Sequence, residues 1–172
     1  MAQARPFTKT MLVIGILMSI EALDLDQCLE SAFGPIESKA GPFEFTFTDY
    51  YDQEMGCRPQ RLFYSFASLV DPSDLAGIKI QTNQLEQRWA VDGERKVNLD
   101  PGILSLSSFI LATTKDRSHR IPLSRGIYGE TTLIYQDKRF NPLAWTYADY
   151  RSEQFCELFR TFRETYKCLL NK

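Results

Sequence analysis

The segment 114–123, TKDRSHRIPL, contains the only histidine of the chain, His119, among basic residues. Histidine is the usual base that activates a serine or cysteine nucleophile. In a ribonuclease-type reaction, one imidazole supplies only one of the two proton-transfer groups, so Glu130 would have to act as its partner, beside Tyr128 and an arginine. We therefore expect His119 to be a loop residue next to a binding surface and not a catalytic residue.

Patterns for other chemistries are weak. The chain has no G-x-S-x-G motif, no glycine-rich phosphate loop and no C-x-x-C or H-x-x-x-H spacing for zinc. Its carboxylates show no marked pair of the kind that glycoside hydrolysis needs. We expect no cofactor, no metal and no enzymatic activity, with ribonuclease activity as the enzymatic alternative.

Basic and tyrosine side chains gather between residues 115 and 139. We expect the loops 115–125 and 138–139 to meet at one end of a sheet and to form a patch that binds RNA or a partner protein. The alternative is a solvated rim of mixed charge, because acidic residues are interleaved. The predicted binding residues are Lys115, Arg117, His119, Arg120, Arg125, Tyr128, Lys138 and Arg139.

The first 22 residues have the pattern of a secretory signal peptide. Arg5 and Lys9 precede an uncharged run over 11–20, and Ala22 suits the last position before a cleavage site. Ten helical residues reach only about 15 Å, too short for a membrane anchor. We expect residues 1–22 to be removed and 23–172 to form a single secreted domain that is monomeric; a buried N-terminal helix is the alternative.

All four cysteines lie after residue 22: Cys28, Cys57, Cys156 and Cys168. An even number in a secreted chain predicts two disulfides. In a helix over 152–170, Cys156 and Cys168 would be about 18 Å apart, and a disulfide needs Cα atoms within about 7 Å. The expected bridges therefore join the N-terminal half to this helix, as Cys28–Cys168 with Cys57–Cys156 or in the crossed pairing.

Residue periodicity predicts one α+β domain with an antiparallel sheet. Helices are expected over 24–34, 59–70 and 152–170, the last with Phe155, Phe159, Phe162 and Tyr166 on one face. Strict alternation over 43–48 predicts a half-buried strand. Further strands are expected over 78–82, 85–91, 94–99, 103–114, 121–129, 131–137 and 140–147, with turns at Asp92-Gly93, 100–102 and Lys138-Arg139.

The succession IPLSRGIYGETTLIYQDKRFNPLAWTYADYRSEQFC resembles the end of the ribonuclease-like secreted effectors of fungal plant pathogens, especially powdery mildews. In that family a short strand, a glycine loop, a tyrosine-containing strand, a basic turn, an aromatic strand and a closing cysteine follow one another. Upstream, DYYDQEMGCRPQRLFYSFASLV is similar to the start of the family, with Cys57 as its first cysteine. The matching positions are Ile121-Pro122-Leu123, 126–129, 132–137, Lys138-Arg139, 140–147 and Cys156, within about residues 57–158.

This resemblance implies a ribonuclease-like fold, a helix packed on a twisted antiparallel sheet, here with an extra C-terminal helix. The effectors are mostly regarded as having lost ribonuclease activity, and they act inside host cells by binding host proteins or RNA. The sequence is therefore expected to be a secreted, non-catalytic virulence protein. Two alternatives stay open: a secreted lipocalin-like carrier of a small ligand, which needs a closed barrel, and an active secreted ribonuclease.

Overall fold

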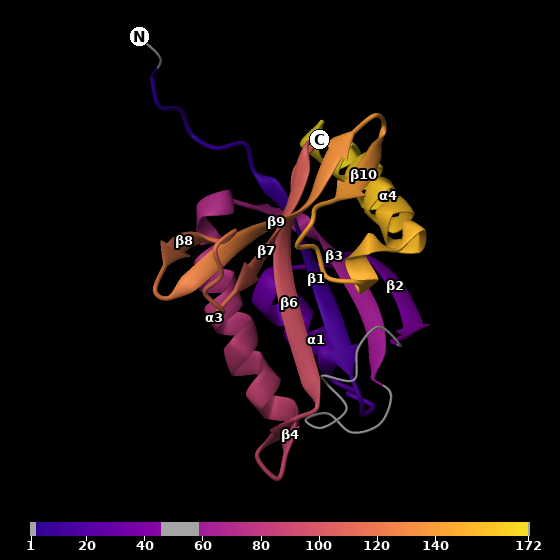
Figure 1. The fold of residues 1–172 in the computed structure, drawn as a ribbon. Helices are drawn as coiled ribbons and strands as arrows, with labels where there is room; N and C mark the ends of the chain where they lie inside the picture. Colours follow the sequence, from indigo (N-terminus) through magenta and orange to yellow (C-terminus); the bar gives the residue numbers. More distant parts are fainter. Residues whose placement is uncertain (1–2, 46–58, 172) are drawn as a thin grey trace.

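The computed structural model describes residues 3–45 and 59–171, which form an eight-stranded antiparallel sheet with helices on both faces (Figure 1). The strand order is β10-β9-β7-β6-β1-β3-β2, and β8 pairs with β9 outside this path. The predicted α+β class with a large antiparallel sheet is confirmed. Among the described strands the path ends at β10 and β2, so these strands do not close into the barrel of a lipocalin-like carrier.

The sheet strands are β1 (Thr10–Met18), β2 (Ile36–Glu44), β3 (Gln60–Val70), β6 (Val97–Leu104), β7 (Ser108–Thr113), β8 (Ile121–Ser124), β9 (Ile127–Gln136) and β10 (Arg139–Pro142). The helices are α1 (Leu25–Phe33), α3 (Leu75–Glu86) and α4 (Glu153–Leu170). A separate two-stranded ribbon consists of β4 (Ala90–Val91) and β5 (Glu94–Arg95). Short 3₁₀ turns are η2 (Pro72–Asp74), η3 (Gln87–Trp89) and η4 (Asp149–Arg151).

β1 is an interior strand that pairs with β3 on one side and β6 on the other. All residues from 10 to 17 are buried. An unbroken apolar run is typical of a strand covered on both faces, and its composition does not distinguish it from the apolar part of a signal peptide. The predicted signal peptide over 1–22 therefore does not fit this fold, because cleavage after Ala22 would remove an interior strand. The alternative of a buried N-terminal helix is wrong in type, since the run is a strand.

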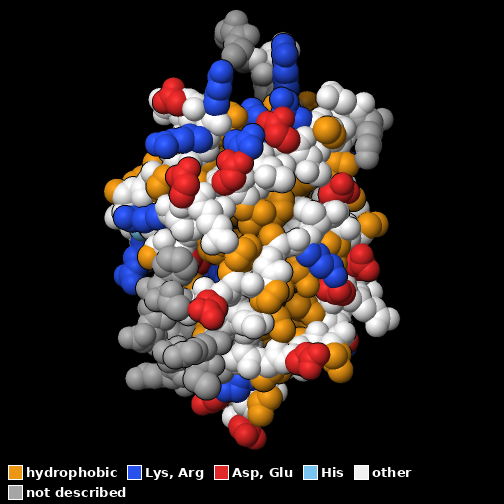
Figure 2. Space-filling model, turned by 90° about the vertical axis from the view of Figure 1, so that its right-hand side faces the viewer, with side chains coloured by type: hydrophobic (Ala, Val, Ile, Leu, Met, Phe, Trp, Pro, Cys, Tyr) orange, Lys and Arg blue, Asp and Glu red, His pale blue; other side chains and the backbone are white. Residues whose placement is uncertain are grey.

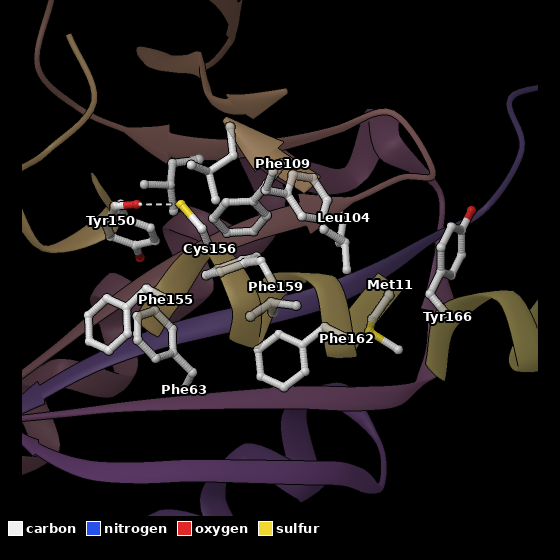
Figure 3. Packing of buried hydrophobic residues seen from close by; sticks show 14 residues of the cluster. Met11, Phe63, Leu104, Phe109, Tyr150, Phe155, Cys156, Phe159, Phe162 and Tyr166 are labelled. Carbon is white, nitrogen blue, oxygen red and sulfur yellow. Dashed lines mark hydrogen bonds between the residues drawn. The ribbon is translucent and has the colours of Figure 1, made fainter. Parts of the chain in front are cut away.

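α4 covers one face of the sheet and confirms the predicted C-terminal helix. Ser152 caps its N-terminus by accepting a hydrogen bond from the Phe155 backbone N–H at 3.2 Å. Phe159 lies at the centre of the core, with its ring against those of Phe63 and Phe109 (Figure 3). Near the end of the helix, the Tyr166 hydroxyl donates to the carbonyl of Lys9 at 2.6 Å, which ties the helix to the residues before β1.

α1 and α3 cover the opposite face. The predicted helix over 24–34 is confirmed as α1, which buries Leu25, Leu29 and Phe33. Asp24 lies just before α1 and accepts a hydrogen bond from the Trp89 indole N–H at 2.8 Å, so α1 is joined to the end of α3. No helix in the described ranges is long and apolar enough to cross a membrane.

Two segments differ in type from the prediction. The expected helix over 59–70 is strand β3, which is buried on both faces in its middle part, so its apolar residues fall at spacings that resemble a helix. The expected strands over 78–82 and 85–91 are helix α3, the turn η3 and the short strand β4. Because the ribonuclease-like arrangement was built on a helix at 59–70, that arrangement stays a prediction without this support.

The turns are partly as expected. Asp92-Gly93 connects β4 to β5 with positive φ at both residues (53° and 80°), as a tight hairpin turn requires. The expected turn at 100–102 is wrong, because these residues lie inside β6. The β9–β10 turn lies one residue earlier than predicted, at Asp137-Lys138. β2 covers the start of the alternating segment 43–48, whose last three residues lie outside the described ranges.

Figure 2 shows the side of the molecule that carries the β2 edge. Hydrophobic side chains form a band down its centre, and charged side chains surround the band. β2 is interrupted by irregular pairing between Ile36 and Ser38 and between Ala40 and Phe43. Such irregularities reduce the ability of an edge strand to pair with another chain.

The predicted disulfide framework is wrong for the cysteines that the structure describes. Cys28, Cys156 and Cys168 are free thiols. Cys28 belongs to α1 and the other two belong to α4, so the sheet lies between them. This separation rules out the expected Cys28–Cys168 bridge. Cys57 lies outside the described ranges.

The sheet splits between β6 and β7. β6 begins at Val97 and β7 continues to Thr113, but the two strands pair only from Gly102 to Leu104. Pro101, which has no N–H to donate, lies at the rung where the pairing stops. Figure 1 shows β7 and β9 diverging from the lower half of β6. The split leaves a space bordered by β6 on one side and by β7 and β9 on the other.

The position of β1 gives a direct test by truncation. A variant that lacks residues 2–22 should not fold, because it loses the strand between β3 and β6. A matched variant that lacks residues 2–7 keeps Lys9 and β1 and should unfold cooperatively near the wild-type midpoint. Circular dichroism during thermal unfolding distinguishes the two. A native-like transition for the longer truncation would show that residues 10–18 are dispensable.

Candidate functional site

A cavity of about 530 Å³ lies in the split between β6 and β7. β3, β6 and α3 form one wall, β7 and β9 form the other, and residues 147–150 contribute from the segment before α4. Its lining residues are Phe45, Arg61, Lys79, Arg95, Asn98, Asp100, Leu111, Ala112, Thr113, Thr114, Lys115, Arg120, Glu130, Tyr147, Ala148, Asp149 and Tyr150.

Lys79 reaches the cavity from the buried face of α3. Its side chain is buried, donates to the Leu99 carbonyl at 2.8 Å and lies 3.8 Å from Asp100. On the same face of α3, one or two turns away, Thr82 and Glu86 are also buried. Residues three or four positions apart share a helix face. α3 therefore turns a polar stripe toward the sheet at a place where most helices carry apolar residues.

Arg61 of β3 is a second buried cation in this wall. One guanidinium nitrogen lies 2.7 Å from Asp149 and the other lies 3.6 Å from Asp100. Only 3% of Arg61 and 3% of Asp149 is exposed. A buried charge is tolerated only when a partner and hydrogen bonds replace water, so this pair fixes β3 relative to the turn before α4.

Arg95 is the third cation of the wall, and polar side chains of neighbouring residues bind its guanidinium. Its guanidinium donates to Asn98 at 2.7 Å and lies 3.3 Å from Glu86. Glu86 also accepts from the backbone N–H of Leu99 at 2.7 Å, while Asn98 donates to Asp100 at 2.8 Å. These hydrogen bonds fix the positions of the Arg95 and Asp100 side chains at the cavity wall.

The opposite wall contains Glu130 of β9, which is 1% exposed. One of its oxygens, Oε2, contacts His119 Nε2 at 3.0 Å and accepts from Arg120 Nε at 2.7 Å. Arg120 also donates to the Tyr147 hydroxyl at 3.0 Å and to the Lys115 carbonyl at 2.8 Å. His119 stacks on Trp145, with ring centroids 5.0 Å apart, and does not line the cavity.

The second oxygen of Glu130, Oε1, has no hydrogen-bond partner among the described residues. Leaving a buried acceptor unsatisfied costs about 1–3 kcal/mol, and more for a charged group. Because Glu130 lines the cavity, a hydrogen-bond donor inside the cavity is the natural partner for this oxygen.

Burial shifts the acidity of these groups. It raises the pKa of Asp149 against the opposing effect of Arg61, and it raises the pKa of Glu86 against that of Lys79 and Arg95. Burial lowers the pKa of Arg120, but the hydrogen bond to Glu130 and the Tyr147 and Glu130 charges outweigh it, so its pKa lies above the usual value. As the pH falls, protonation of Asp149 and Glu86 makes the cavity wall more positive.

The charge of the lining residues is positive. Among the described lining residues, five cations, Arg61, Lys79, Arg95, Lys115 and Arg120, face three carboxylates, Asp100, Glu130 and Asp149, a formal excess of +2 for this part of the lining. Phe45, Tyr147 and Tyr150 add aromatic surface. In the parts of the chain that the structure describes, no group of three or more His, Cys, Asp or Glu side chains is placed to hold a metal ion.

The predicted binding residues are only partly brought together. Lys115 and Arg120 line the cavity, and His119 supports Glu130 from behind. Arg117 belongs to the same exposed loop, where its carbonyl accepts from the Arg120 backbone N–H at 3.0 Å. Arg125 is not among the lining residues of the cavity, and its guanidinium lies against Gly77 of α3.

Lys138 and Arg139 do not join this group. Tyr128 lies near one end of β9, paired with Thr113, whereas Arg139 follows the other end and pairs with Gln136. At about 3.3 Å per residue, Tyr128 and Gln136 are about 26 Å apart. The expected single patch of the loops 115–125 and 138–139 is therefore wrong, because the two loops lie at opposite ends of β9.

Sequence reasoning missed Arg61, Lys79, Asp100 and Asp149. These residues are distant in sequence. Arg61 lies in an expected helix, Lys79 in an expected strand and Asp100 in an expected turn, and the structure has a different element at each of these positions. One pattern could have indicated α3: Leu75, Lys79, Thr82 and Glu86 recur at helical spacing behind the Asp71-Pro72-Ser73 cap, in which Asp71 accepts from the Ser73 N–H at 2.9 Å.

Fold and cavity together define an α+β protein with a polar cavity between two diverging strands of its sheet. The family model named "Domain of unknown function (DUF4416)" matches residues 8–166, so the chain belongs to this family. The match includes β1 and every residue that lines the cavity. No curated protein and no solved structure matches the chain. The effector resemblance and the expected secretion stay predictions.

The Arg61–Asp149 pair leads to a stability prediction. Asp149→Ala should lower the free energy of unfolding by about 3–5 kcal/mol at neutral pH, because it leaves the buried Arg61 guanidinium without its nearest carboxylate. Urea unfolding measures the change. Glu157→Ala, which removes the exposed α4 pair with Arg160, is the matched control and should change stability little. Equal effects for the two variants would contradict a structural requirement for the buried pair.

Proposed function

We propose that this protein binds a small organic anion, a phosphate ester or a carboxylate, in the cavity between β6 and β7. The observation that carries the proposal is a set of three cations around a space of about 530 Å³: Arg61 and Lys79 are buried, and Arg95 is partly exposed. Pockets of about 300–1,000 Å³ hold metabolite-sized ligands.

The cost of burying these groups argues for a function rather than for stability. Apolar residues of similar volume would fill the split between the strands with no loss of stability, since buried ion pairs seldom stabilise more than a packed core does. The chain instead keeps Lys79 and Glu86 on the buried face of α3 and Asp100 inside β6. Polar groups that are fixed in advance around a cavity are typical of ligand sites.

The arrangement favours anions over cations. Arg61, Lys79 and Arg95 supply N–H donors, and phosphate and carboxylate oxygens accept hydrogen bonds from such donors. Acidification strengthens this preference, because burial raises the pKa of Asp149 and Glu86, and each carboxylate loses its negative charge as it is protonated. Tyr147 at the mouth, 46% exposed, offers a ring on which a planar part of the ligand packs.

Anion binding can be tested with inorganic phosphate. Phosphate should raise the midpoint of thermal unfolding, because a ligand that binds the folded state stabilises it. Lys79→Gln and Lys115→Gln should each weaken phosphate binding by about tenfold, the usual consequence of losing one hydrogen bond to a charged group. Isothermal titration calorimetry measures the affinity, and urea unfolding checks that each variant is folded.

Lys138→Gln is the matched control, since it removes the same charge at the far end of β9. It should leave phosphate affinity unchanged. Absence of any stabilisation by phosphate, or an equal loss of affinity in the control, would contradict the proposal.

A second candidate function is RNA cleavage, and one observation favours it. His119 and Arg120 both contact Glu130 Oε2, so an imidazole, a carboxylate and a guanidinium meet at one point. Such a group can transfer a proton and stabilise the charge on a phosphate. The stacking of His119 on Trp145, outside the cavity lining, makes this the weaker candidate.

This second candidate predicts measurable turnover of a synthetic RNA. His119→Ala should then reduce the cleavage rate by about 100-fold or more, the usual effect of removing a general acid or base. Lys138→Gln should cleave at the wild-type rate. Gel analysis of a labelled oligonucleotide gives both rates. Absence of cleavage, or cleavage that survives His119→Ala, would eliminate a ribonuclease mechanism based on His119.

A further inference from the structure

The two oxygens of Glu130 are in different situations. Oε2 is held by His119 at 3.0 Å and by Arg120 at 2.7 Å, so the carboxylate cannot rotate without breaking both contacts. Oε1 has no hydrogen-bond partner among the residues that the structure describes. Because only 1% of Glu130 is exposed, bulk water does not replace the missing partner. Buried acceptors are nearly always paired, so an orphaned one calls for an explanation.

The surroundings of Glu130 favour a ligand over a missing protein contact. Glu130 lines the cavity, and its strand neighbour Leu111 lines it as well. The nearest basic side chains, His119 and Arg120, are already committed to Oε2. An acceptor that is fixed at a cavity wall is suited to a hydrogen-bond donor on a bound molecule.

We propose that Glu130 Oε1 accepts a hydrogen bond from an O–H or N–H group of the ligand, so that the site takes an anion that is also hydroxylated or carries an amino or amide group. This inference rests on the proposed function and narrows its ligand class. The anionic part faces Arg61, Lys79 and Arg95, and the donor faces Glu130.

Electrostatics fixes the orientation of such a ligand. A second carboxylate or phosphate next to Glu130 would meet a like charge, and Arg120 is already paired with Glu130. The opposite wall carries three cations against Asp100 and Asp149. The anionic group is therefore placed at the wall of β3, β6 and α3, and the neutral donor is placed at β9.

The distance between the walls limits ligand size. Leu111 pairs with Glu130 on one side and with Gly102 of β6 on the other. Adjacent strands are about 4.8 Å apart, so the β9 and β6 backbones are separated by about 10 Å at this rung. A ligand with several bonds between its anionic group and its donor can lie between these two backbones.

Matched pairs of phosphate esters test this inference on the full chain. The pairs are glycerol 3-phosphate with propyl phosphate, and adenosine 5′-monophosphate with the analogue that has hydrogen in place of the 6-amino group. In wild type, at least one donor-bearing member should bind about tenfold or more tightly than its partner, because a site built to pair a donor rejects the analogue that lacks it. Calorimetry gives the ratio within each pair.

Glu130→Gln should bring that ratio close to one, because the amide can turn its own N–H₂ toward the cavity, while Lys138→Gln should keep the ratio. The comparison in wild type needs no variant, so it stands even where Glu130→Gln does not fold. Equal binding of both members of every pair overturns the inference alone. A ratio that survives in Glu130→Gln also overturns it, since the donor is then recognised elsewhere. Absence of binding by all four esters and by phosphate overturns the proposed function together with the inference.

Discussion

The buried pair of Arg61 and Asp149 joins the two parts of the molecule on which the rest depends. Arg61 belongs to β3 in the middle of the sheet, and Asp149 begins the turn that leads into α4. The pair needs space, and Gly15 of β1 provides it: a Cβ atom there would lie 2.6 Å from the Tyr150 hydroxyl and 3.3 Å from Arg61 Nη1. The absence of a side chain at Gly15 therefore lets β1, the Arg61 guanidinium and the turn before α4 pack closely together.

The residues of β6 on either side of its last pairing with β7 explain why the sheet opens there. Above the split, the ring of Phe109 packs against Gly102 so closely that a Cβ atom at Gly102 would lie 2.4 Å from it, and β6 and β7 stay paired. Below the split, Pro101 cannot continue the ladder, and charged side chains of β6 and α3 occupy the space. Apolar packing on one side and paired charges on the other therefore keep a stable sheet and a polar cavity in adjacent parts of one strand.

Sequence patterns predicted the elements whose periodicity is simple and failed where burial on both sides or buried charge removes that periodicity. α4 was predictable because one face is apolar and the other charged. The same patterns predict a helix for β3 and part of a signal peptide for β1, since both are interior strands without polar alternation.

α3 was missed for the opposite reason, because its buried face carries Lys79, Thr82 and Glu86. Of the site, the loop residues Lys115, His119 and Arg120 were identified, and Glu130 was considered as a partner of His119. The wall of Arg61, Lys79 and Asp149 depends on contacts between residues up to 88 positions apart, which no local pattern contains.

The place of β1 in the sheet also determines the order in which the protein can be assembled. This strand is synthesised before both of its neighbours, β3, about 50 residues later, and β6, which ends at Leu104. Its apolar side chains therefore lack one of their two neighbouring strands until residue 104 has been synthesised. Such long-range pairing slows folding and leaves apolar surface of β1 exposed in folding intermediates, which favours aggregation.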